Sequence, residues 1–424
     1  MMYSFIYRYF FYPLLYLSFQ TLAMISPKVK KALQLRQSQN SKAPWLNSPP
    51  QMKPLWFHCA SGEFEYAKPV INALKKRNPE IKILLTYFSP SILENVQNFK
   101  NLDFFCPLPW DRPKVLEEFI HYHQPRALLI ARTDAWPEML TQTKQMNVPS
   151  LLFSATLAKQ SSRMNFLAKH FTAWTLRMLS EIHCVSQDDL ENFRELGLAK
   201  ITHVCGDTRY DQVIDRLKNP KPVKDQLFRH SPQEKIFVAG STWPEDEEVL
   251  FEAIRKVSAN YKFVIVPHEP TAQHLAELKQ KAEKIGKKIE LYSQSLNWNK
   301  DAILIIDVVG ILAEVYAYAS VAFVGGSFRK SVHSVMEPLA AGCVSFVGPK
   351  HHNNREALYM KSISIGELHP VIEVKNAKEL SKRLSQIEKQ DLGDVSHKIR
   401  NLIVLRAGEA TEKILKWVLP LIAL

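Results

Sequence analysis

The chain has 424 residues, of which 46% are hydrophobic and 23% are charged. This composition is typical of a globular protein of two or three domains, and it excludes a disordered chain, a collagen and a protein with many membrane spans. Lys and Arg outnumber Asp and Glu by 55 to 42, a net charge of +13 that predicts an anionic partner such as nucleic acid, an anionic membrane or a phosphorylated ligand.

Residues 1–36 contain an uncharged run from Phe10 to Ile25, followed by a basic flank. The run is shorter than the roughly 20 residues of a spanning helix, and its tyrosines suit the membrane interface. We therefore expect an interfacial membrane anchor whose flank lies on anionic headgroups. A single membrane span and a cleaved signal peptide are the alternatives. The basic residues of the flank are Lys28, Lys30, Lys31 and Arg36.

Short apolar runs alternate with amphipathic helical patterns through residues 50–215. Such alternation indicates βαβ units around a parallel sheet, and hence a Rossmann-like domain. Charged and proline-containing residues 216–233 are predicted to be a linker. Strands are predicted at residues 55–59, 81–87, 127–131 and 150–154.

Residues 234–424 repeat the scheme, with a helix predicted to begin near Pro244. The expected fold is α/β, with two Rossmann-like doubly wound domains facing a cleft and an N-terminal hydrophobic membrane anchor. The last helix could pack back on the N-terminal domain. Strands are predicted at residues 235–239, 261–266, 303–306, 321–324 and 345–347.

The five cysteines are odd in number and show no CxxC spacing. Neither a disulfide framework nor a structural zinc site is therefore expected. His351 and His352 are adjacent, but neighbouring side chains point in different directions and no third ligand has a suitable spacing. We expect reduced cysteines, no metal and no cofactor.

Ligands of doubly wound sheets bind beyond the carboxyl ends of the strands. Glu63 follows the first predicted strand and could act as a general base, or merely cap the next helix. Arg132 and Asp134 follow the strand at residues 127–131 and could orient a ligand, or pair with each other. The two loops of the first domain therefore hold three candidate residues.

Two loops of the second domain are also candidates. The segment Gly240-Ser241-Thr242 precedes a predicted helix, whose N-terminus could cradle an anion, although the P-loop pattern is absent. The Gly325-Gly326 pair would allow a ligand to approach the backbone closely. Glu337, at the start of the following helix, could accept hydrogen bonds from ribose hydroxyls.

Taken in order, these segments resemble the bacterial Kdo transferases, which move 3-deoxy-D-manno-octulosonic acid (Kdo) from CMP-Kdo to a lipid A precursor in lipopolysaccharide biosynthesis. The resemblance covers nearly the whole chain. That family has two Rossmann-like domains in the GT-B arrangement and a membrane-associated N-terminus. The matching segments are residues 58–69, 109–113, 133–137, 240–244, 307–317, 325–327, 333–338 and 353–356.

The resemblance implies an inverting, metal-independent transfer in which Glu63 is the general base. Its implied partners are the CMP-Kdo donor, the lipid A precursor and the anionic inner leaflet, with no nucleic acid, at the cytoplasmic face of the bacterial inner membrane. Arg132, Arg209 and Arg355 are candidate cations for the carboxylated sugar. The implied acceptor- or sugar-binding residues are Ser61, Gly62, Arg132 and Asp134. The implied nucleotide-binding residues are Ser241, Thr242, His268, Gly310, Ile311, Ser334 and Glu337.

The chain departs from the family pattern inside these loops. The loop before Glu63 is one residue shorter, and Arg132 stands where the family has Glu. The segment Pro267-His268-Glu269 lacks the family's arginine at the nucleotide phosphate. The alternatives are therefore a related GT-B transferase with another donor or acceptor, and an inactive membrane-bound binding protein. The other departures are Trp243, Ile311 and Ser334.

Overall fold

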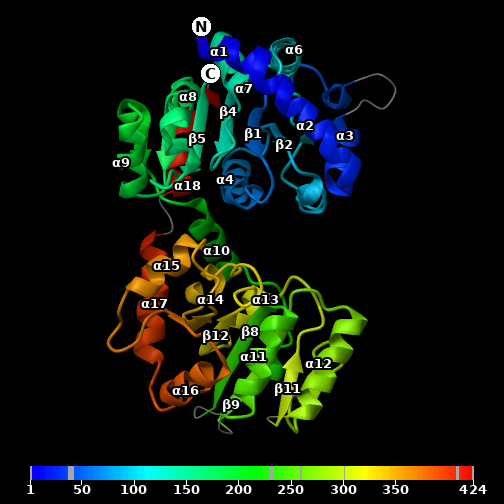
Figure 1. The fold of residues 1–424 in the computed structure, drawn as a ribbon, viewed down its shortest axis with the longest axis vertical. Coiled ribbons are helices and arrows are strands. Elements are labelled where there is room, and N and C mark those ends of the chain that lie inside the picture. The colour runs from blue at the N-terminus through cyan, green and yellow to red at the C-terminus, as the bar shows by residue number, and fades with distance from the viewer. Residues whose placement is uncertain are drawn as a thin grey trace. The chain divides into compact units, whose positions relative to one another are not determined.

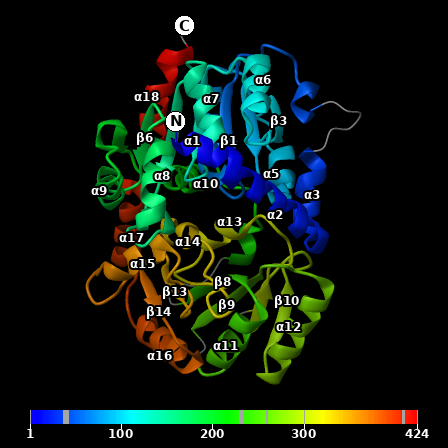
Figure 2. The same cartoon turned by 45° about the horizontal axis from the view of Figure 1, so that its top comes forward.

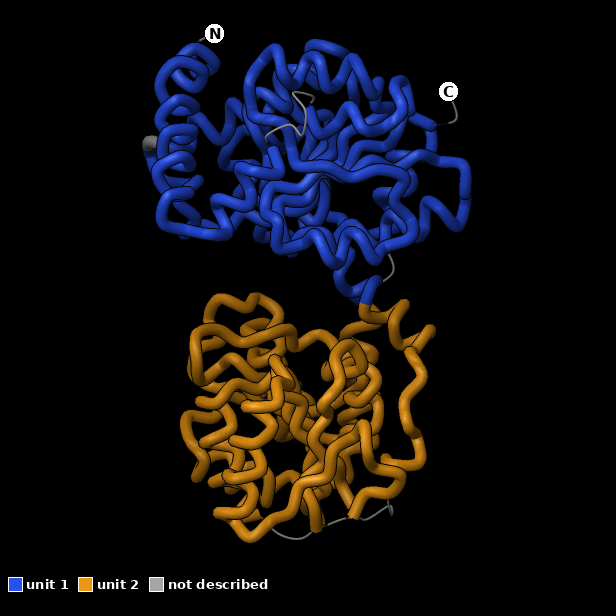
Figure 3. Tube along the Cα trace, turned by 90° about the vertical axis from the view of Figure 1, so that its right-hand side faces the viewer, with its two compact units in different colours: residues 1–212, 406–424 blue, residues 213–405 orange. Residues whose placement is uncertain are grey.

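The computed structural model describes residues 2–36, 43–228, 234–257, 260–299, 301–406 and 410–422. The chain forms two compact units, coloured separately in Figure 3. Unit 1 comprises residues 1–212 and 406–424, and unit 2 comprises residues 213–405.

The division between the units falls inside a helix, close to the expected boundary at residue 215. The described part of the expected linker belongs to unit 2, because Arg216 and Lys221 both donate hydrogen bonds to the Gly310 carbonyl, at 3.0 and 2.9 Å. The rest of that segment, residues 229–233, lies outside the described residues.

Unit 1 is built on a seven-stranded parallel sheet with the order β3-β2-β1-β4-β5-β6-β7. Strands β1 to β6 are each labelled in Figure 1 or Figure 2. The chain steps outward from β1 to β3 and then returns to β4 on the other side of β1. This reversal is the topological switch point, where the carboxyl ends of two strands border a crevice. The strands are β1 (Leu55–Cys59), β2 (Ile83–Tyr87), β3 (Phe104–Pro107), β4 (Ala127–Ala131), β5 (Ser150–Ala155), β6 (Glu181–Cys184) and β7 (Thr202–Val204).

Helices cover both faces of this sheet. Successive side chains of a strand point to opposite faces, so Phe57 packs in one core cluster and Trp56 in the other. The last helix, α18, returns to unit 1 and buries Ile414, Leu415 and Val418 in the cluster of Phe57. The helices are α4 (Phe64–Arg77), α5 (Leu93–Gln97), α6 (Pro113–His123), α7 (Pro137–Gln145), α8 (Phe166–Leu176), α9 (Gln187–Glu195), α10 (Thr208–Lys218) and α18 (Ala410–Ile422).

The N-terminal segment is helical and docks on unit 1 beside α7 and α8, as Figure 2 shows. The Tyr7 hydroxyl donates to Asp111 at 2.6 Å. The Arg8 guanidinium donates to both carboxylate oxygens of buried Glu138, at 2.7 and 2.9 Å. Among the described residues, no helix is both long and apolar enough to cross a membrane. The elements are α1 (Met2–Ile6), the π-helical turn η1 (Tyr7–Phe11), α2 (Tyr12–Ile25) and α3 (Pro27–Arg36).

The basic flank of this segment divides into two parts. Lys28, Lys30 and Lys31 are exposed. Arg36 instead turns inward, where it donates to the carbonyls of Phe88 and Leu108 at 2.9 and 3.2 Å. Burial lowers the pKa of Arg36 to about 10. The carbonyl oxygens and the aromatic rings of the loops after β2 and β3 attract the Arg36 cation. Arg36 therefore connects α3 to these two loops.

Unit 2 repeats the architecture with the sheet order β10-β11-β9-β8-β12-β13-β14, again parallel. Its switch point lies between β8 and β12. The strands are β8 (Lys235–Thr242), β9 (Tyr261–Pro267), β10 (Lys288–Leu291), β11 (Ala302–Ile305), β12 (Val321–Val324), β13 (Val344–Val347) and β14 (Val371–Glu373). The helices are α11 (Pro244–Ile254), α12 (Ala272–Lys284), α13 (Leu312–Tyr316), α14 (Met336–Ala340), α15 (Arg355–Ser362), α16 (Ala377–Glu388) and α17 (Gly393–Arg406). Two parallel-sheet α/β domains are thus confirmed.

Candidate functional site

Glu63 lies in the turn between β1 and α4, at the switch point of unit 1. Its carboxylate accepts a hydrogen bond from the Ser61 backbone N–H at 2.8 Å and makes no capping bond to α4. The side chain is therefore not used as a helix cap. It lines an open hollow of about 340 Å³, whose other lining residues are Gly62, Glu65, Tyr66, Arg132 and Arg209.

Two arginines meet at the hydroxyl of Tyr66 in this hollow. Arg132 Nη1 donates to Tyr66 Oη at 2.6 Å, and Arg209 Nη1 donates to it at 3.3 Å. Both guanidinium groups also lie over the ring, 4.9 and 5.4 Å from its centroid. Burial and the nearby Asp207 carboxylate raise the pKa of Tyr66, although the arginines oppose this shift. The hollow thus holds two permanent cations beside the Glu63 carboxylate.

The backbone of Arg132 is left-handed, with φ of +68°. Such a conformation costs a non-glycine residue about 1–2 kcal/mol and is concentrated at functional sites. It sends Arg132 to Tyr66, whereas Asp134 binds His58 Nε2 at 2.9 Å. The Arg132–Asp134 ion pair considered from the sequence is therefore replaced by two separate contacts.

Asp134 ends a buried chain of hydrogen bonds that starts in the core. Trp56 Nε1 donates to the Thr86 hydroxyl at 2.8 Å, and that hydroxyl lies 2.9 Å from His58 Nδ1. Trp136 Nε1 also donates to Asp134, at 3.0 Å. Burial alone would raise the pKa of Asp134, but the contacts with His58 and Trp136 outweigh it and lower that pKa. The carboxylate is therefore held ionised and fixed in direction.

In unit 2, the turns after β8 and β12 approach each other closely at the switch point. A Cβ on Gly325 would lie 2.1 Å from the Ser241 carbonyl oxygen, so only glycine fits there. Asp246 joins the two turns, because it accepts hydrogen bonds from the backbone N–H groups of Trp243 at 3.0 Å, Gly326 at 2.7 Å and Phe328 at 3.0 Å. The close approach therefore depends on both a glycine and a buried carboxylate.

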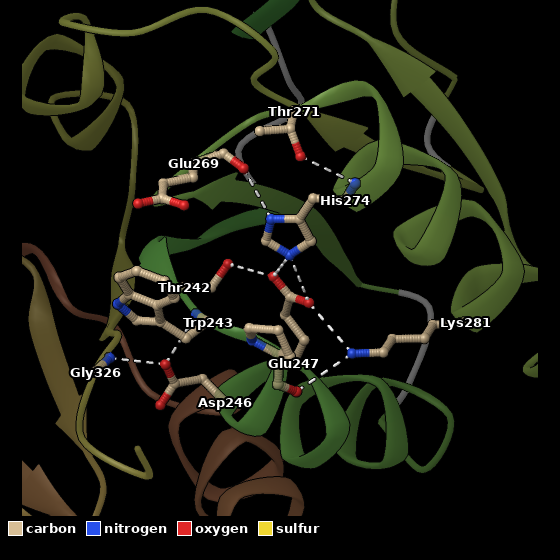
Figure 4. A network of polar contacts seen from close by, with 10 residues as sticks. Thr242, Trp243, Asp246, Glu247, Glu269, Thr271, His274, Lys281 and Gly326 are labelled. Carbon is tan, nitrogen blue, oxygen red and sulfur yellow. Dashed lines mark hydrogen bonds and ion pairs between the residues drawn. The ribbon is translucent and has the colours of Figure 1, made fainter. Parts of the chain in front are cut away.

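The Thr242 hydroxyl points into the protein and donates to Glu247 at 3.0 Å (Figure 4). His274 Nε2 contacts the same carboxylate at 2.8 Å, and Lys281 Nζ at 3.2 Å. His274 Nδ1 lies 2.9 Å from the Glu269 carbonyl oxygen. Both ring nitrogens of His274 thus lie within hydrogen-bonding distance of an oxygen atom. This network ties the turn after β8 to the loop after β9.

His268 lies in an aromatic stack. The centroid of its ring lies 4.6 Å from the centroid of the Trp243 ring and 4.6 Å from that of the His333 ring. Trp243 Nε1 donates to His333 Nε2 at 3.0 Å. Burial and the neighbouring His268 lower the pKa of His333 to about 4. Ser334 is next to this stack in sequence, and its hydroxyl accepts from the Met336 N–H at 3.3 Å.

The remaining predicted nucleotide contacts lie around α13 and α14. Glu337 lines a pocket of about 400 Å³ with Glu314, Arg216 and Lys221. Gly310 has φ of +89°, which favours glycine. Burial opposes ionisation of Glu314, but hydrogen bonds from Arg216 at 2.9 and 3.0 Å hold its pKa below the usual value. Ile311 is the N-cap residue of α13, and Arg355 opens α15.

Comparison with known proteins gives a consistent assignment. A family model described as 3-deoxy-D-manno-octulosonic-acid transferase (kdotransferase) matches residues 28–212. The 3-deoxy-D-manno-octulosonic acid transferase of Aquifex aeolicus is 31% identical over 340 residues, which cover 78% of this chain and 85% of the relative. The chain belongs to the Kdo transferase family.

Further Kdo transferases show the same similarity at lower identity. The enzyme of Haemophilus influenzae is 26% identical and spans 91% of both chains. Among solved structures, the fold is similar to that of UDP-GlcNAc 2-epimerase from Neisseria meningitidis, with a TM-score of 0.61 and 14% identity over 86% of this chain and 99% of that one. That likeness bears on the fold alone.

The structure of this Kdo transferase family member brings some predicted residues together and separates others. Glu63, Gly62, Arg132 and Arg209 share one hollow, whereas Asp134 is held by His58. Tyr66, which joins the arginines, was not predicted, because an aromatic residue on a helix face usually indicates core. Among the described residues, no group of three or more His, Cys, Asp or Glu side chains could hold a metal ion. The five cysteines are buried and unpaired with one another.

Proposed function

We propose that this chain transfers Kdo from CMP-Kdo to a lipid A precursor in lipopolysaccharide biosynthesis, with Glu63 as general base. Membership of the Kdo transferase family supports the reaction. The observation that carries the site assignment is the shared hollow of Glu63, Arg132 and Arg209 at the carboxyl edge of the sheet. In it, a carboxylate able to accept a proton lies beside two cations able to hold a carboxylated sugar.

The proposed step is a single inverting displacement. The Glu63 carboxylate takes the proton of the acceptor hydroxyl as that oxygen attacks the anomeric carbon of Kdo. The bond from that carbon to the phosphate oxygen of CMP breaks, and CMP leaves with the electron pair. The bond from Ser61 N–H to Glu63 fixes the carboxylate in direction, which suits a general base that must be positioned to within about 1 Å.

Arg132 and Arg209 are proposed to bind the carboxylate of Kdo. Tyr66 aligns them by accepting a hydrogen bond from each. Each guanidinium group offers a planar fork of N–H donors that matches the two oxygens of a carboxylate. In this arrangement the replacement of the family's Glu by Arg132 adds a cation to the hollow.

The test is transfer from CMP-Kdo, generated in situ, to a lipid A precursor in detergent, with CMP release as the readout. Glu63→Gln should reduce turnover by about 10²- to 10⁴-fold, because a general base contributes on that scale. Glu94→Gln, at an exposed position of α5 in the same unit, is the matched control and should retain turnover. Near wild-type turnover in Glu63→Gln would remove Glu63 from this role. An inactive wild-type protein would favour another donor or acceptor.

We also propose that the N-terminal segment lies in the interface of the bacterial inner membrane, on its cytoplasmic face. The side of α2 that faces away from the rest of unit 1 leaves large apolar side chains exposed, including Leu14 at 67% and Met24 at 86% of their surface. Exposed apolar side chains followed by three exposed lysines suit an anionic leaflet.

Substituting exposed residues tests this location without removing the contacts of Tyr7 and Arg8. A Leu14→Glu, Leu17→Glu double variant should no longer sediment with anionic liposomes, although its transfer activity in detergent should persist. Leu296→Glu, an exposed leucine of unit 2, is the control and should still sediment. Unchanged sedimentation of the double variant would place the membrane contact elsewhere.

A further inference from the structure

Trp243 and Arg329 stand on the two turns that border the switch point of unit 2. Trp243 follows β8, and Arg329 lies in the turn after β12. Crevices between such turns are where open parallel sheets bind their ligands. The Arg329 guanidinium lies 3.7 Å from the centroid of the Trp243 ring, so a cation and an aromatic face meet between the two turns.

The start of α11 is already occupied by carboxylates of the chain itself. Asp246 accepts the backbone N–H of Trp243, and Glu247 accepts the Thr242 hydroxyl (Figure 4). Both carboxylates are fully buried. The Trp243 N–H and the Thr242 hydroxyl are therefore already used by the chain itself, so a cation for a ligand anion at this strand end would come from another element.

Arg329 is the cation best placed for this role. Arg329 Nε lies 3.8 Å from Glu245 Oε1. The side chains of Arg329 and Glu245 are 44% and 51% exposed, respectively. An exposed pair at that distance is weak. Stacking on Trp243 orients the guanidinium group, whose N–H edge can then donate to two oxygens of a phosphate. Stacking therefore orients Arg329 without using up its donors.

Trp243 is also in contact with two histidine rings, His268 and His333. Because Trp243 Nε1 donates to His333 Nε2, a neutral His333 carries its proton on Nδ1. The His268 ring stacks on both the Trp243 ring and the His333 ring, which are themselves in direct contact. Trp243 thus contacts all three side chains, because it stacks with Arg329 and His268 and donates to His333.

We propose that Arg329, stacked on Trp243 and backed by His268, forms the subsite for the phosphate of a nucleoside monophosphate group, and that Arg329 is its specificity-determining residue. This inference rests on the proposed function, because the phosphate is that of the CMP part of the donor. It assigns the phosphate to the turn after β12 rather than to the helix start after β8.

The experiment measures binding of CMP and of cytidine to the full chain in detergent by calorimetry. The quantity of interest is the ratio of the two affinities, since it isolates the phosphate. Arg329→Gln should lower this ratio about 10- to 100-fold, as expected for a hydrogen-bonded charge pair, and leave cytidine affinity unchanged. Lys330→Gln, an exposed neighbour in the same turn, is the matched control and should keep the ratio. Arg329→Lys, which keeps the charge but not the planar stacking, should lie between them.

The outcomes separate this inference from the proposed function. An unchanged ratio in Arg329→Gln, with CMP still bound, would overturn the subsite and leave the proposed donor standing. If the wild type binds UMP but not CMP, and Arg329→Gln lowers the affinity for UMP, the subsite stands and the donor fails. If the wild type binds neither nucleotide, both fail. Equal losses for CMP and cytidine would show a structural effect and would also overturn the subsite.

Discussion

His123, at the end of α6, is a buried histidine whose two ring nitrogens have no hydrogen-bond partner among the described residues. It is surrounded by aromatic rings, with Phe119 at 4.6 Å and Tyr122 at 5.1 Å between centroids. Burial lowers its pKa from 6.5 to about 4. Replacing it by phenylalanine keeps the ring and removes the unsatisfied groups, so we expect His123→Phe to stabilise unit 1.

The expected gain in the free energy of unfolding has one part that is independent of pH and one part that depends on pH. Burying an unsatisfied polar group costs about 1–3 kcal/mol, which His123→Phe recovers at pH 7.5. Below pH 6.5 the unfolded chain binds a proton at His123 that the folded chain excludes, so the wild type loses about 1.4 kcal/mol per pH unit. This loss ends near pH 4, where both states are protonated, and totals about 3.5 kcal/mol at most.

Urea denaturation of both proteins at pH 7.5, 6.0 and 5.0 measures the difference in the free energy of unfolding. We expect His123→Phe to be more stable at pH 7.5 and its advantage to grow as the pH falls. A variant that is less stable at every pH, with a difference that does not change, would refute the reasoning. The two ring nitrogens would then have partners in solution, such as buried water.

Three further predictions concern the two sites. Gly325→Ala should destabilise unit 2 by at least about 2 kcal/mol in thermal denaturation, because its Cβ would meet the Ser241 carbonyl at 2.1 Å, whereas Gly62→Ala has open space and should not. Asp246→Asn should cost about 1–3 kcal/mol, since an amide oxygen cannot serve all three N–H donors; unchanged stability would contradict this. Tyr66→Phe should lower kcat/KM for transfer about 10-fold, because the hydrogen bonds from the two arginines are lost. Unchanged kinetics would show that the arginines are aligned without the Tyr66 hydroxyl.

Much of the fold could be predicted from the sequence, since strands buried on both faces are continuous apolar runs. The run at residues 55–59 became β1 and that at 321–324 became β12, and α11 begins at the predicted Pro244. Some strands were not predicted. Two of them, β6 and β10, are short and carry Glu or Lys among their apolar residues. Their pairing is set by neighbouring strands, which a local pattern does not record.

The sequence by itself determined which segments lie at strand ends, and therefore that Glu63 and Arg132 belong to one crevice: parallel strands place all their carboxyl ends at one edge. Side-chain partners depended on the tertiary structure. It turned Thr242 toward Glu247 and parted Arg132 from Asp134. A side chain bonds to whichever group folding brings within about 3 Å, and that group is often far away along the chain.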